Sequence, residues 1–320
     1  MSSGKEAVKA ALLANGIIAI MKLIGSIYSG SASMLAEFKH SVADWTNGLF
    51  LLIGINQSGK SADERFQFGH GKKAFFWAFI ASLGMLFIGG ALSIEGGIEK
   101  ILHPEPLKHV ILNIVILLLS VLFECYSLLK AVQAILVESG GEYTGFSSII
   151  KVPKVLSKAN PNTKFIFFED TAALLGLLIA FSAILISYYS GETIWDGIAS
   201  VIIGILLLTI GLMTAKENMN NILGEAAEPK LILEVGNFAR SLNGVKDINE
   251  VKSMIIGPGK YLFYIIIEAH PEIRLKNLDD LELMVRDKLK IQFSELEFVH
   301  INAIADNNIP DWESQAKTLQ

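Results

Sequence analysis

The stretch Ile194–Ala215, IWDGIASVIIGILLLTIGLMTA, decides the fold class of this chain, because it carries no charged residue after Asp196. About 20 apolar residues of α-helix are needed to cross the hydrocarbon core of a bilayer, and this stretch meets that length. Five earlier segments are also long and apolar enough to cross a bilayer, at roughly Ala7–Tyr28, Ser33–Ile55, Ala74–Ile98, Val110–Val137 and Phe165–Tyr189. The sequence therefore predicts an integral membrane protein with an all-α bundle of six transmembrane helices.

Lys and Arg residues are unevenly distributed over the connections between these segments. Short cytoplasmic loops of membrane proteins carry an excess of both residues, so the richer connections are expected to face the cytoplasm. The richer set comprises Lys5, Lys9, Lys60, Arg65, Lys72, Lys73, Lys151, Lys154, Lys158 and Lys164, and the opposite set holds Lys100 and Lys108. Both termini are therefore predicted to be cytoplasmic. Without a signal or transit peptide pattern at the N-terminus, we expect a prokaryotic cytoplasmic membrane.

The charge balance of the chain changes near residue 216. Residues 1–215 hold 15 Lys plus Arg and 15 Asp plus Glu, so the whole formal charge of −5 arises in residues 216–320. This change predicts a transmembrane domain at 1–216, a cytoplasmic α+β domain at 217–305 and a frayed polar tail at 306–320. The acidic soluble part argues against nucleic-acid binding. The single cysteine excludes an intrachain disulfide.

Periodicity and turn residues predict the order α-β-β-α-β for the soluble domain, a small sheet with helices on one face. The elements are expected at Pro229–Leu242, Ile248–Ile256, Tyr261–Ala269, Leu278–Ile291 and Glu297–Ile304. A domain of about 90 residues has a small core, so dimerisation is expected to help stabilise it. Residues 139–164 are expected to form a long structureless loop, to which the sequence assigns no role.

The segment Ser33–Ile55 carries ionisable groups that a lipid-facing helix would exclude. Such groups are expensive inside a bilayer, which makes them candidates for a functional site. His40 and Asp44 are four residues apart and share one helical face, where an imidazole and a carboxylate form half of a tetrahedral site for a divalent cation. Glu37 and Asn47 lie near the same stripe and are further candidates. The alternative is a structural His–Asp hydrogen bond between packed helices.

Two adjacent carboxylates, Glu169 and Asp170, begin the fifth predicted span. Acidic groups are common in the first turn of a helix, where they offset its dipole, but the apolar run before these two places them below the membrane surface. Ala173 and Gly176 follow and leave room for a neighbouring helix, for which Ser33–Ile55 is the expected partner.

Three further charges fall within or at the ends of the predicted spans. For Glu124 and Lys22, the lining of a water-filled pathway, proton transfer and simple ion pairing all remain open. Asp196 is expected to act as a helix cap or first-turn acid.

Three stretches together resemble the cation diffusion facilitator family of divalent-metal/proton antiporters. They are SASMLAEFKHSVAD at 31–44, RFQFGHGK at 65–72 and WDGIASVIIG at 195–204, which look like the family's metal motif, its signature and the opening of its sixth helix. The predicted spans, their orientation and the soluble domain agree with the family. The resemblance covers nearly the whole chain and implies a homodimeric transporter with a metallochaperone-like cytoplasmic domain.

Within the family, the chain looks like the zinc transporter nine branch. The stretches EDTAALLG at 169–176 and GEAAEP at 224–229 carry this similarity, as does the long segment at 139–164 with Asn160-Pro161. The family's usual motif on its fifth helix is HxxxD. If Asp170 fills the Asp position, Ile166 stands where a ligand is expected.

The resemblance therefore implies His40, Asp44 and Asp170 as metal ligands and leaves the fourth position to Glu169, with Asn47, Glu37 or a water as substitutes. Glu169 and Asp170 are separated by about 100° around a helix. Both therefore reach one ion only if the start of the helix is distorted or Glu169 bends back.

Two further metal sites of the family have partial counterparts. Near the signature, Asp63 and His70 match two ligand positions but Phe66 occupies a third, so we expect that site to be absent or weak, with His70 serving packing instead. In the soluble domain, His270 and His300 remain as candidates for a regulatory site at a dimer interface. Both fall at strand ends, where an exposed histidine is common.

The sequence as a whole predicts zinc efflux from the cytoplasm by zinc/proton antiport, with zinc as the transported ion and no prosthetic group. A ligand set with His favours zinc, cobalt or nickel, whereas the excess of carboxylates makes manganese or iron the nearest alternatives. A membrane protein that binds metal or acts as a scaffold without transport is a second class. No enzyme motif is evident, so the chain is expected not to be an enzyme.

Overall fold

The computed structural model describes residues 2–156 and 161–319. Contacts divide the chain into two units, one of Met1–Leu52 and Ala78–Lys216 and one of Ile53–Trp77 and Glu217–Gln320. By its contacts, the segment Ile53–Trp77 thus lies with the C-terminal unit. The functional domains predicted at 1–216, 217–305 and 306–320 stay a proposal.

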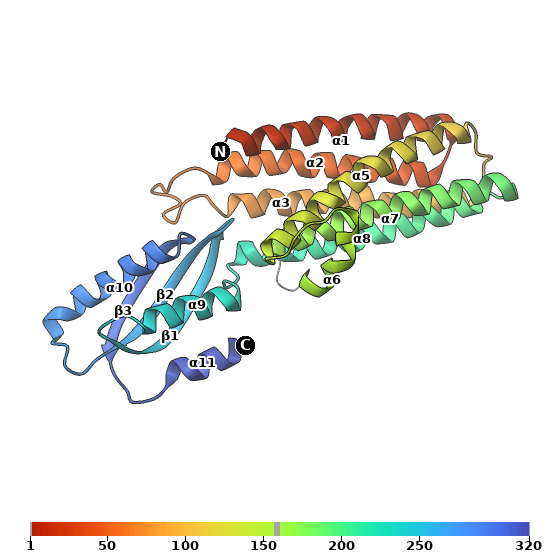
Figure 1. Ribbon diagram of the computed structural model, residues 1–320. Helices are drawn as coiled ribbons and strands as arrows, with labels where there is room; N and C mark the ends of the chain where they lie inside the picture. Colours follow the sequence, from red (N-terminus) through yellow and green to blue (C-terminus); the bar gives the residue numbers. More distant parts are fainter. Residues whose placement is uncertain (1, 157–160, 320) are drawn as a thin grey trace. The chain divides into compact units, whose positions relative to one another are not determined.

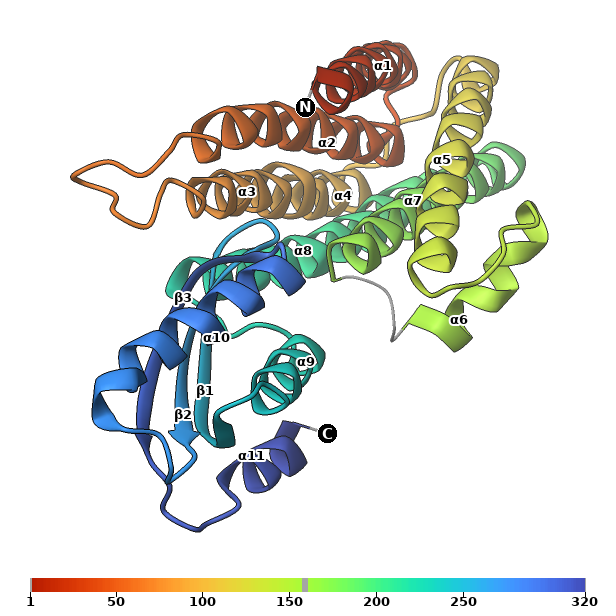
Figure 2. The same cartoon turned by 60° about the vertical axis from the view of Figure 1, so that its left-hand side comes forward.

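The six predicted spans are confirmed as long helices (Figures 1 and 2). They are α1 (Ser2–Ser29), α2 (Ala32–Ser58), α5 (Val110–Glu138), α7 (Pro161–Ser190), α8 (Ile194–Leu223) and a continuous helix over Lys73–Leu102. That last helix consists of α3 (Lys73–Gly84), the π-helical segment η1 (Met85–Ala91) and α4 (Leu92–Leu102).

Five of these helices are long and apolar enough to cross a membrane. The remaining one, α2, has 27 residues but carries Glu37, Lys39 and Asp44. Large apolar side chains point outward from the unit: Leu13, Ile111 and Leu122 are 72%, 79% and 68% exposed. An outward apolar surface of this kind fits a lipid environment.

The core of the first unit lies among α2, α5, α7 and α8. Its fully buried side chains include Met34, Leu117, Leu177, Ile184, Ile203 and Leu207. Glycines let a further helix approach α8: a Cβ on Gly97 would lie 2.7 Å from the carbonyl oxygen of Gly197, and one on Gly204 would lie 2.8 Å from the amide nitrogen of Ile94. Small residues at such crossings permit close packing of membrane helices.

Asp196, in the first turn of α8, closes the N-terminus of α2. Its Oδ2 accepts a hydrogen bond from the amide of Ala32 at 2.6 Å, and its Oδ1 accepts one from the Ser31 hydroxyl at 2.7 Å. The amide of Ser33 donates to Oδ1 at 3.2 Å, and the Ser33 hydroxyl donates to the same oxygen. The prediction of a first-turn acid is confirmed, and the helix whose N-terminus Asp196 caps is the neighbouring α2, not its own helix.

The expected structureless loop at 139–164 is partly wrong. A 3₁₀ helix η2 (Phe146–Lys151) and the short α6 (Val152–Val155) lie in it, and α7 already begins at Pro161. The fully buried Val152 packs with Ile135 and Leu136 of α5, so apolar contacts hold the segment against that helix. Residues 157–160 of the predicted loop lie outside the described residues.

The second unit has the predicted order α-β-β-α-β: α9 (Pro229–Arg240), β1 (Val245–Gly257), β2 (Lys260–Ala269), α10 (Leu278–Gln292) and β3 (Leu296–Ala305). The sheet has the order β1-β2-β3, with β1 and β2 antiparallel and β2 and β3 parallel (Figure 2). Alternate residues of β2, Phe263, Ile265 and Ile267, form one core with apolar side chains of α9 and α10. The helices therefore cover one face of the sheet, as predicted.

The tail predicted to be frayed contains a helix, α11 (Asp311–Leu319). Trp312 is 1% exposed, and its ring nitrogen donates to Asn237 Oδ1 at 2.8 Å. The Gln315 amide also pairs with both backbone groups of Val251, at 3.0 and 2.8 Å, on the outer side of β1. α11 thus protects an edge strand that would otherwise present open backbone groups.

Candidate metal site

His40 and Asp44 lie one turn apart on α2, with His40 Nε2 and Asp44 Oδ2 separated by 3.4 Å. The His40 side chain is 2% exposed. Neither ring nitrogen of His40, nor Asp44 Oδ1, has a hydrogen-bond partner among the described residues. The alternative of a structural His–Asp hydrogen bond is therefore not realised. A buried imidazole with free nitrogens beside a free carboxylate oxygen is a set of donors that a divalent cation can use.

Glu169 and Asp170 face different neighbours from the same turn of α7. Glu169 lines one small cavity together with Asn47 of α2. Asp170 Oδ2 accepts a hydrogen bond from Ser127 Oγ of α5 at 3.0 Å. The separation of about 100° between successive helical residues accounts for this division. Glu169 therefore points toward the helix that carries His40, whereas Asp170 points toward α5.

Four carboxylates in the first unit act on one another electrostatically: Asp44, Glu124, Glu169 and Asp170. Lys22 and His40 supply basic groups within reach of this acidic cluster. So many acids of one sign in a poorly solvated region repel one another strongly. A bound divalent cation would relieve that repulsion.

Gly176, which has no side chain, lets α7 pack closely against α2 beside Glu37. A Cβ on Gly176 would lie 2.6 Å from Glu37 Oε1, closer than such atoms approach in practice. The expected role of Gly176, to admit the α2 helix, is confirmed. Glu37 itself is occupied by an ion pair, since its Oε2 lies 2.8 Å from Lys22 Nζ.

A π-helical segment borders the same region. Met85, the first residue of η1, lines a small cavity together with Asn47, Glu169, Ala81, Ser82 and Thr214. π-helical turns inside α-helices are frequent at functional sites. In the described part of the chain, however, no three His, Cys, Asp or Glu side chains already converge on one point as a metal-binding group.

Ile166 lies one turn before Asp170 on α7, at the position where the family resemblance implies a ligand. Its side chain is apolar and 48% exposed. Ile166 thus supplies no donor atom, and a fourth ligand has to come from another residue or from water.

The signature loop forms its own compact structure within the second unit. Asp63 Oδ2 lies 2.8 Å from His70 Nε2, and the ring of Phe66 packs on the ring of His70 at 4.6 Å. Hydrogen bonds from the Phe66 amide and from the His70 ring lower the pKa of Asp63. His70 is buried and Gly71 lies against the backbone of Ile256. These contacts fit a packing role for His70, and weak metal binding by this loop stays a prediction.

His270 directly follows β2, as predicted, whereas His300 lies within β3 and the prediction that it falls at a strand end is wrong. His300 pairs in register with Tyr264 and stacks on its ring at 5.3 Å. His270 follows Tyr264 by six residues, and six residues of strand span roughly 20 Å. The cavities beside His300 are lined by both basic and acidic side chains, namely Arg286, Lys290, Asp279, Glu282 and Asp287. Nothing in this arrangement brings the two histidines to one ion within a single chain.

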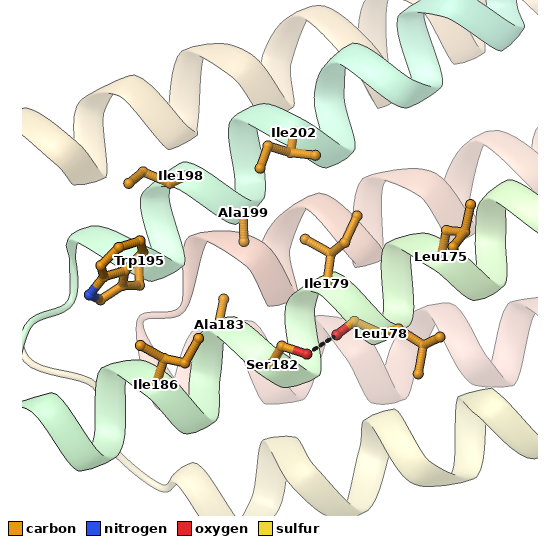
Figure 3. Close-up of a pocket in the computed structure, with 10 residues that line it drawn as sticks. All are labelled: Leu175, Leu178, Ile179, Ser182, Ala183, Ile186, Trp195, Ile198, Ala199 and Ile202. Atoms are coloured by element: carbon orange, nitrogen blue, oxygen red, sulfur yellow. Dashed lines mark hydrogen bonds between the residues drawn. The ribbon is translucent and has the colours of Figure 1, made fainter.

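An apolar groove lies between α7 and α8, as Figure 3 shows. Its lining is apolar apart from two groups, the Ser182 hydroxyl and the ring nitrogen of Trp195. The Ser182 hydroxyl donates a hydrogen bond to the Leu178 carbonyl at 2.7 Å. The groove therefore has no group of the kind that binds metal ions and is separate from the candidate site.

Sequence reasoning missed the hydrogen bond to Asp170 and the residues around the small cavity. Ser127 follows Glu124 by three residues, a spacing that places both on one face of a helix. That spacing is a signal that could have identified Ser127. No comparable pattern marks Ser82 or Thr214, which only the packing of separate helices brings near Glu169.

Residues 8–223 match the family model described as the cation efflux transmembrane domain. The Xenopus laevis protein named "Proton-coupled zinc antiporter SLC30A9, mitochondrial" is 26% identical over 298 residues, which cover 92% of this chain and 52% of that protein. Metal tolerance protein C4 of Arabidopsis thaliana is 28% identical, over 85% of this chain and 59% of its own length. The chain therefore spans little more than half the length of these relatives.

A bacterial relative is matched over most of its length. The Manganese efflux system protein MneP of Bacillus subtilis is 24% identical, over 91% of this chain and 93% of its own. The solved structure of "MamM-CTD 215-293" is 17% identical over 24% of this chain, with a TM-score of 0.23. That last likeness supports no conclusion about the function of the C-terminal unit.

Proposed function

The chain belongs to the cation efflux family, and on that premise we propose that it exports a divalent metal ion, zinc, from the cytoplasm in exchange for protons. The observation that carries this proposal is the acidic cluster beside His40 in helices of membrane-spanning length. Ionisable groups persist at such positions when they bind or conduct ions. The family is one of transporters, so an enzymatic role has no support.

We assign the ion to a position between α2 and α7. His40 and Asp44 are the first two ligands, Asp170 is the third and Glu169 the fourth, with Asn47 in reach of Glu169. Metal binding requires deprotonated ligands, so arrival of the ion displaces protons and return of protons displaces the ion. His40 is the proposed coupling group because the same ring nitrogen binds either a proton or the metal ion.

The choice of metal rests on the donor types. A histidine nitrogen favours zinc or cobalt, whereas several carboxylates suit manganese or iron. The Xenopus relative is named as a zinc antiporter and the Bacillus relative as a manganese efflux protein. We propose zinc, with manganese, iron or cobalt as alternatives.

A non-transporting protein that binds metal or acts as a scaffold is the second candidate function. It is favoured by Ile166, which leaves one ligand position empty, and by the separation of Glu169 from Asp170 on α7. The membrane and a second copy of the chain, forming a homodimer, are the proposed partners in either case.

Transport by purified protein in liposomes distinguishes these functions. An imposed proton gradient should drive uptake of zinc, with manganese, cobalt and iron tested in turn, and uptake should move protons in the opposite direction. Asp44→Asn removes a ligand charge at nearly constant shape, so we expect a loss of at least about 10–100-fold in uptake, the range measured for lesser changes around metal sites. Glu234→Gln, on the exposed surface of α9, should leave uptake unchanged.

Two results would contradict the proposal. If no metal moves while the protein binds metal at equilibrium, the scaffold function is favoured. If metal moves equally well in Asp44→Asn, the site lies elsewhere in the bundle.

A further inference from the structure

Most of the buried polar side chains that have an unpartnered atom in the first unit lie on α2, α5 and α7. Among the described residues of that unit, the full set is Glu37, His40, Asp44, Ser93, Asn113, Ser120 and Ser187. His40 and Asp44 belong to the proposed metal site, but the serines and the asparagine have no part in it. Buried polar groups without a protein partner normally bind ordered water, so each of them needs an explanation.

Asn113 of α5 is the clearest case. Its side chain is fully buried, and neither its amide oxygen nor its amide nitrogen has a hydrogen-bond partner among the described residues. A Cβ on Gly25 of α1 would lie 3.0 Å from Asn113 Oδ1 and 3.5 Å from Met34 Cε of α2, so the amide lies close to both helices. An amide without partners is very unfavourable inside a bilayer. Water is therefore the partner that this position requires.

One side of α5 carries further hydroxyl groups from Asn113 toward the metal site. Ser120 and Ser127 follow Asn113 by seven and fourteen residues, a spacing that keeps all three on one side of a helix. The Ser127 hydroxyl bonds to α7, so this side of α5 faces α7. The Ser120 hydroxyl makes no bond to its own helix, whereas those of Ser139 and Ser182 each donate to a carbonyl one turn earlier. Ser120 is thus available to another partner.

These groups lead from the metal site to one end of the first unit, where α1 ends, α5 begins and α7 ends (Figures 1 and 2). Asn113 lies one turn from the start of α5, and Ser187 lies one turn from the end of α7. Glu37 precedes His40 by one turn of α2 and is nearer to this end. Unpartnered polar atoms therefore occur at successive levels between the site and the end of the bundle.

We propose that Asn113, Ser120 and Ser187 hold ordered water and form the exit route by which the metal ion leaves its site toward this end of the bundle. This inference rests on the proposed function. An ion that leaves its ligands has to regain oxygen atoms around it at once. Neutral hydroxyl and amide oxygens, together with the water that they bind, supply such atoms without holding the ion too tightly to pass.

The ion pair between Lys22 of α1 and Glu37 borders the exit route without closing it to a cation. Lys22 Nζ and Glu37 Oε2 are 2.8 Å apart and both side chains are buried, so the ammonium charge is balanced where it stands. Glu37 Oε1 has no hydrogen-bond partner among the described residues and is free to contact a passing ion. A carboxylate oxygen of this kind offsets the repulsion that Lys22 alone would exert.

Hydroxyl radicals formed from bound water by X-ray radiolysis oxidise nearby side chains and so test for water at Asn113. Met34 is the reporter, because it is fully buried and lies beside the same glycine as the Asn113 amide. In the full-length protein in lipid nanodiscs, Met34 should be oxidised, whereas Phe263, fully buried in the apolar core of the second unit, should not. Asn113→Leu removes both polar groups at similar volume and should abolish most of the oxidation of Met34.

Zinc uptake into liposomes tests the exit route itself. Asn113→Leu and Ser120→Ala should each slow uptake by about tenfold, because each removes a polar group that contacts the ion or its water. Equilibrium zinc affinity should not change, since neither residue is a proposed ligand. Ser93→Ala is the matched control, because Ser93 carries an equally buried and unpartnered hydroxyl on α4, outside the route, and both readouts should stay at the wild-type level. Ser120→Ala carries the test if Asn113→Leu does not fold.

Three results would overturn the inference. If Met34 in the wild type is oxidised no more than Phe263, the Asn113 amide is dry, and Asn113→Leu should then raise the free energy of unfolding. If the oxidation of Met34 depends on Asn113 but uptake is normal in both variants, the metal leaves elsewhere and the proposed function stands. If the wild type takes up no metal although Met34 is oxidised, the proposed function fails and the exit route fails with it.

Discussion

Replacement of Asp196 by alanine should destabilise the first unit without altering the proposed metal site. The side chain is fully buried and accepts hydrogen bonds from the amides of Ala32 and Ser33 at the start of α2. In Asp196→Ala both amides lose their acceptor inside the protein, and each unsatisfied buried group costs about 1–3 kcal/mol. The hydroxyls of Ser31 and Ser33 can rotate to other acceptors and add less. We expect a loss of roughly 3–5 kcal/mol in the free energy of unfolding.

Reversible unfolding in mixed detergent micelles, titrated with sodium dodecyl sulfate, measures that loss. Asp196→Asn keeps one carbonyl oxygen as acceptor and should lose about half as much. Glu192→Ala, at an exposed acid in the connection just before α8, is the matched control and should be neutral. Asp44 follows Ala32 by twelve residues, roughly 18 Å along the helix, so zinc affinity should not change in any of the three variants. A loss below about 1 kcal/mol in Asp196→Ala, or a tenfold loss of zinc affinity, would refute the capping role of Asp196.

Three further predictions follow from packing and charge. Gly176→Ala should lower the free energy of unfolding by about 1–3 kcal/mol, because its Cβ meets Glu37 Oε1, whereas Gly84→Ala, with open space around it, should be neutral. Trp312→Ala removes a buried side chain that ties α11 to Asn237, so trypsin should cleave after Lys317 in the folded protein much faster than in the wild type. Burial and the neighbouring carboxyl of Asp306 raise the pKa of Glu268, so its stabilising contribution is present at low pH and is lost as pH rises. Glu268→Gln should therefore gain more in unfolding temperature at pH 8 than at pH 5.

The positions of the elements could be predicted because each long helix needs only a run of apolar residues, and each strand of the second unit alternates between a core face and an open face. Ile248–Ile256 and Tyr261–Ala269 carry that alternation in the sequence itself, and β1 and β2 extend them by a few residues at most. The helix α11 could not be predicted in this way. Its stability comes from the insertion of Trp312 beside Gly236 and from the pairing of Gln315 with Val251, which are contacts with distant segments.

The proximity of His40 and Asp44 could be predicted from the sequence for the same reason that the helices could, whereas their role as metal ligands stays a prediction. The four-residue spacing of His40 and Asp44 is a property of one helix, and the structure reproduces it. The direction in which Glu169 and Asp170 point is a property of several helices, since it depends on how α7 is rotated against α2 and α5. The sequence shows that the two acids cannot point the same way, but only the packing shows which neighbour each one meets.

The rotation of α7 against α2 and α5 affects how Asp170 could take part in the proposed transport cycle. Asp170 accepts a hydrogen bond from Ser127 of α5, whereas Glu169 lies beside Asn47 of α2, so the two carboxylates of α7 face different neighbours. If Asp170 exchanges its hydrogen bond with Ser127 for an ion bound by His40 and Asp44, a turn or shift of α7 against α5 would accompany that exchange. Gly176 and Ala173 put no bulky side chain in the way of such a shift, since small residues let membrane helices slide in close contact. Metal binding would then be coupled to helix movement by the exchange of one hydrogen bond at Asp170. Ser127→Ala, which frees Asp170 in advance, should raise zinc affinity and slow the release of zinc, whereas a fall in affinity would show that Ser127 orients Asp170 for the ion.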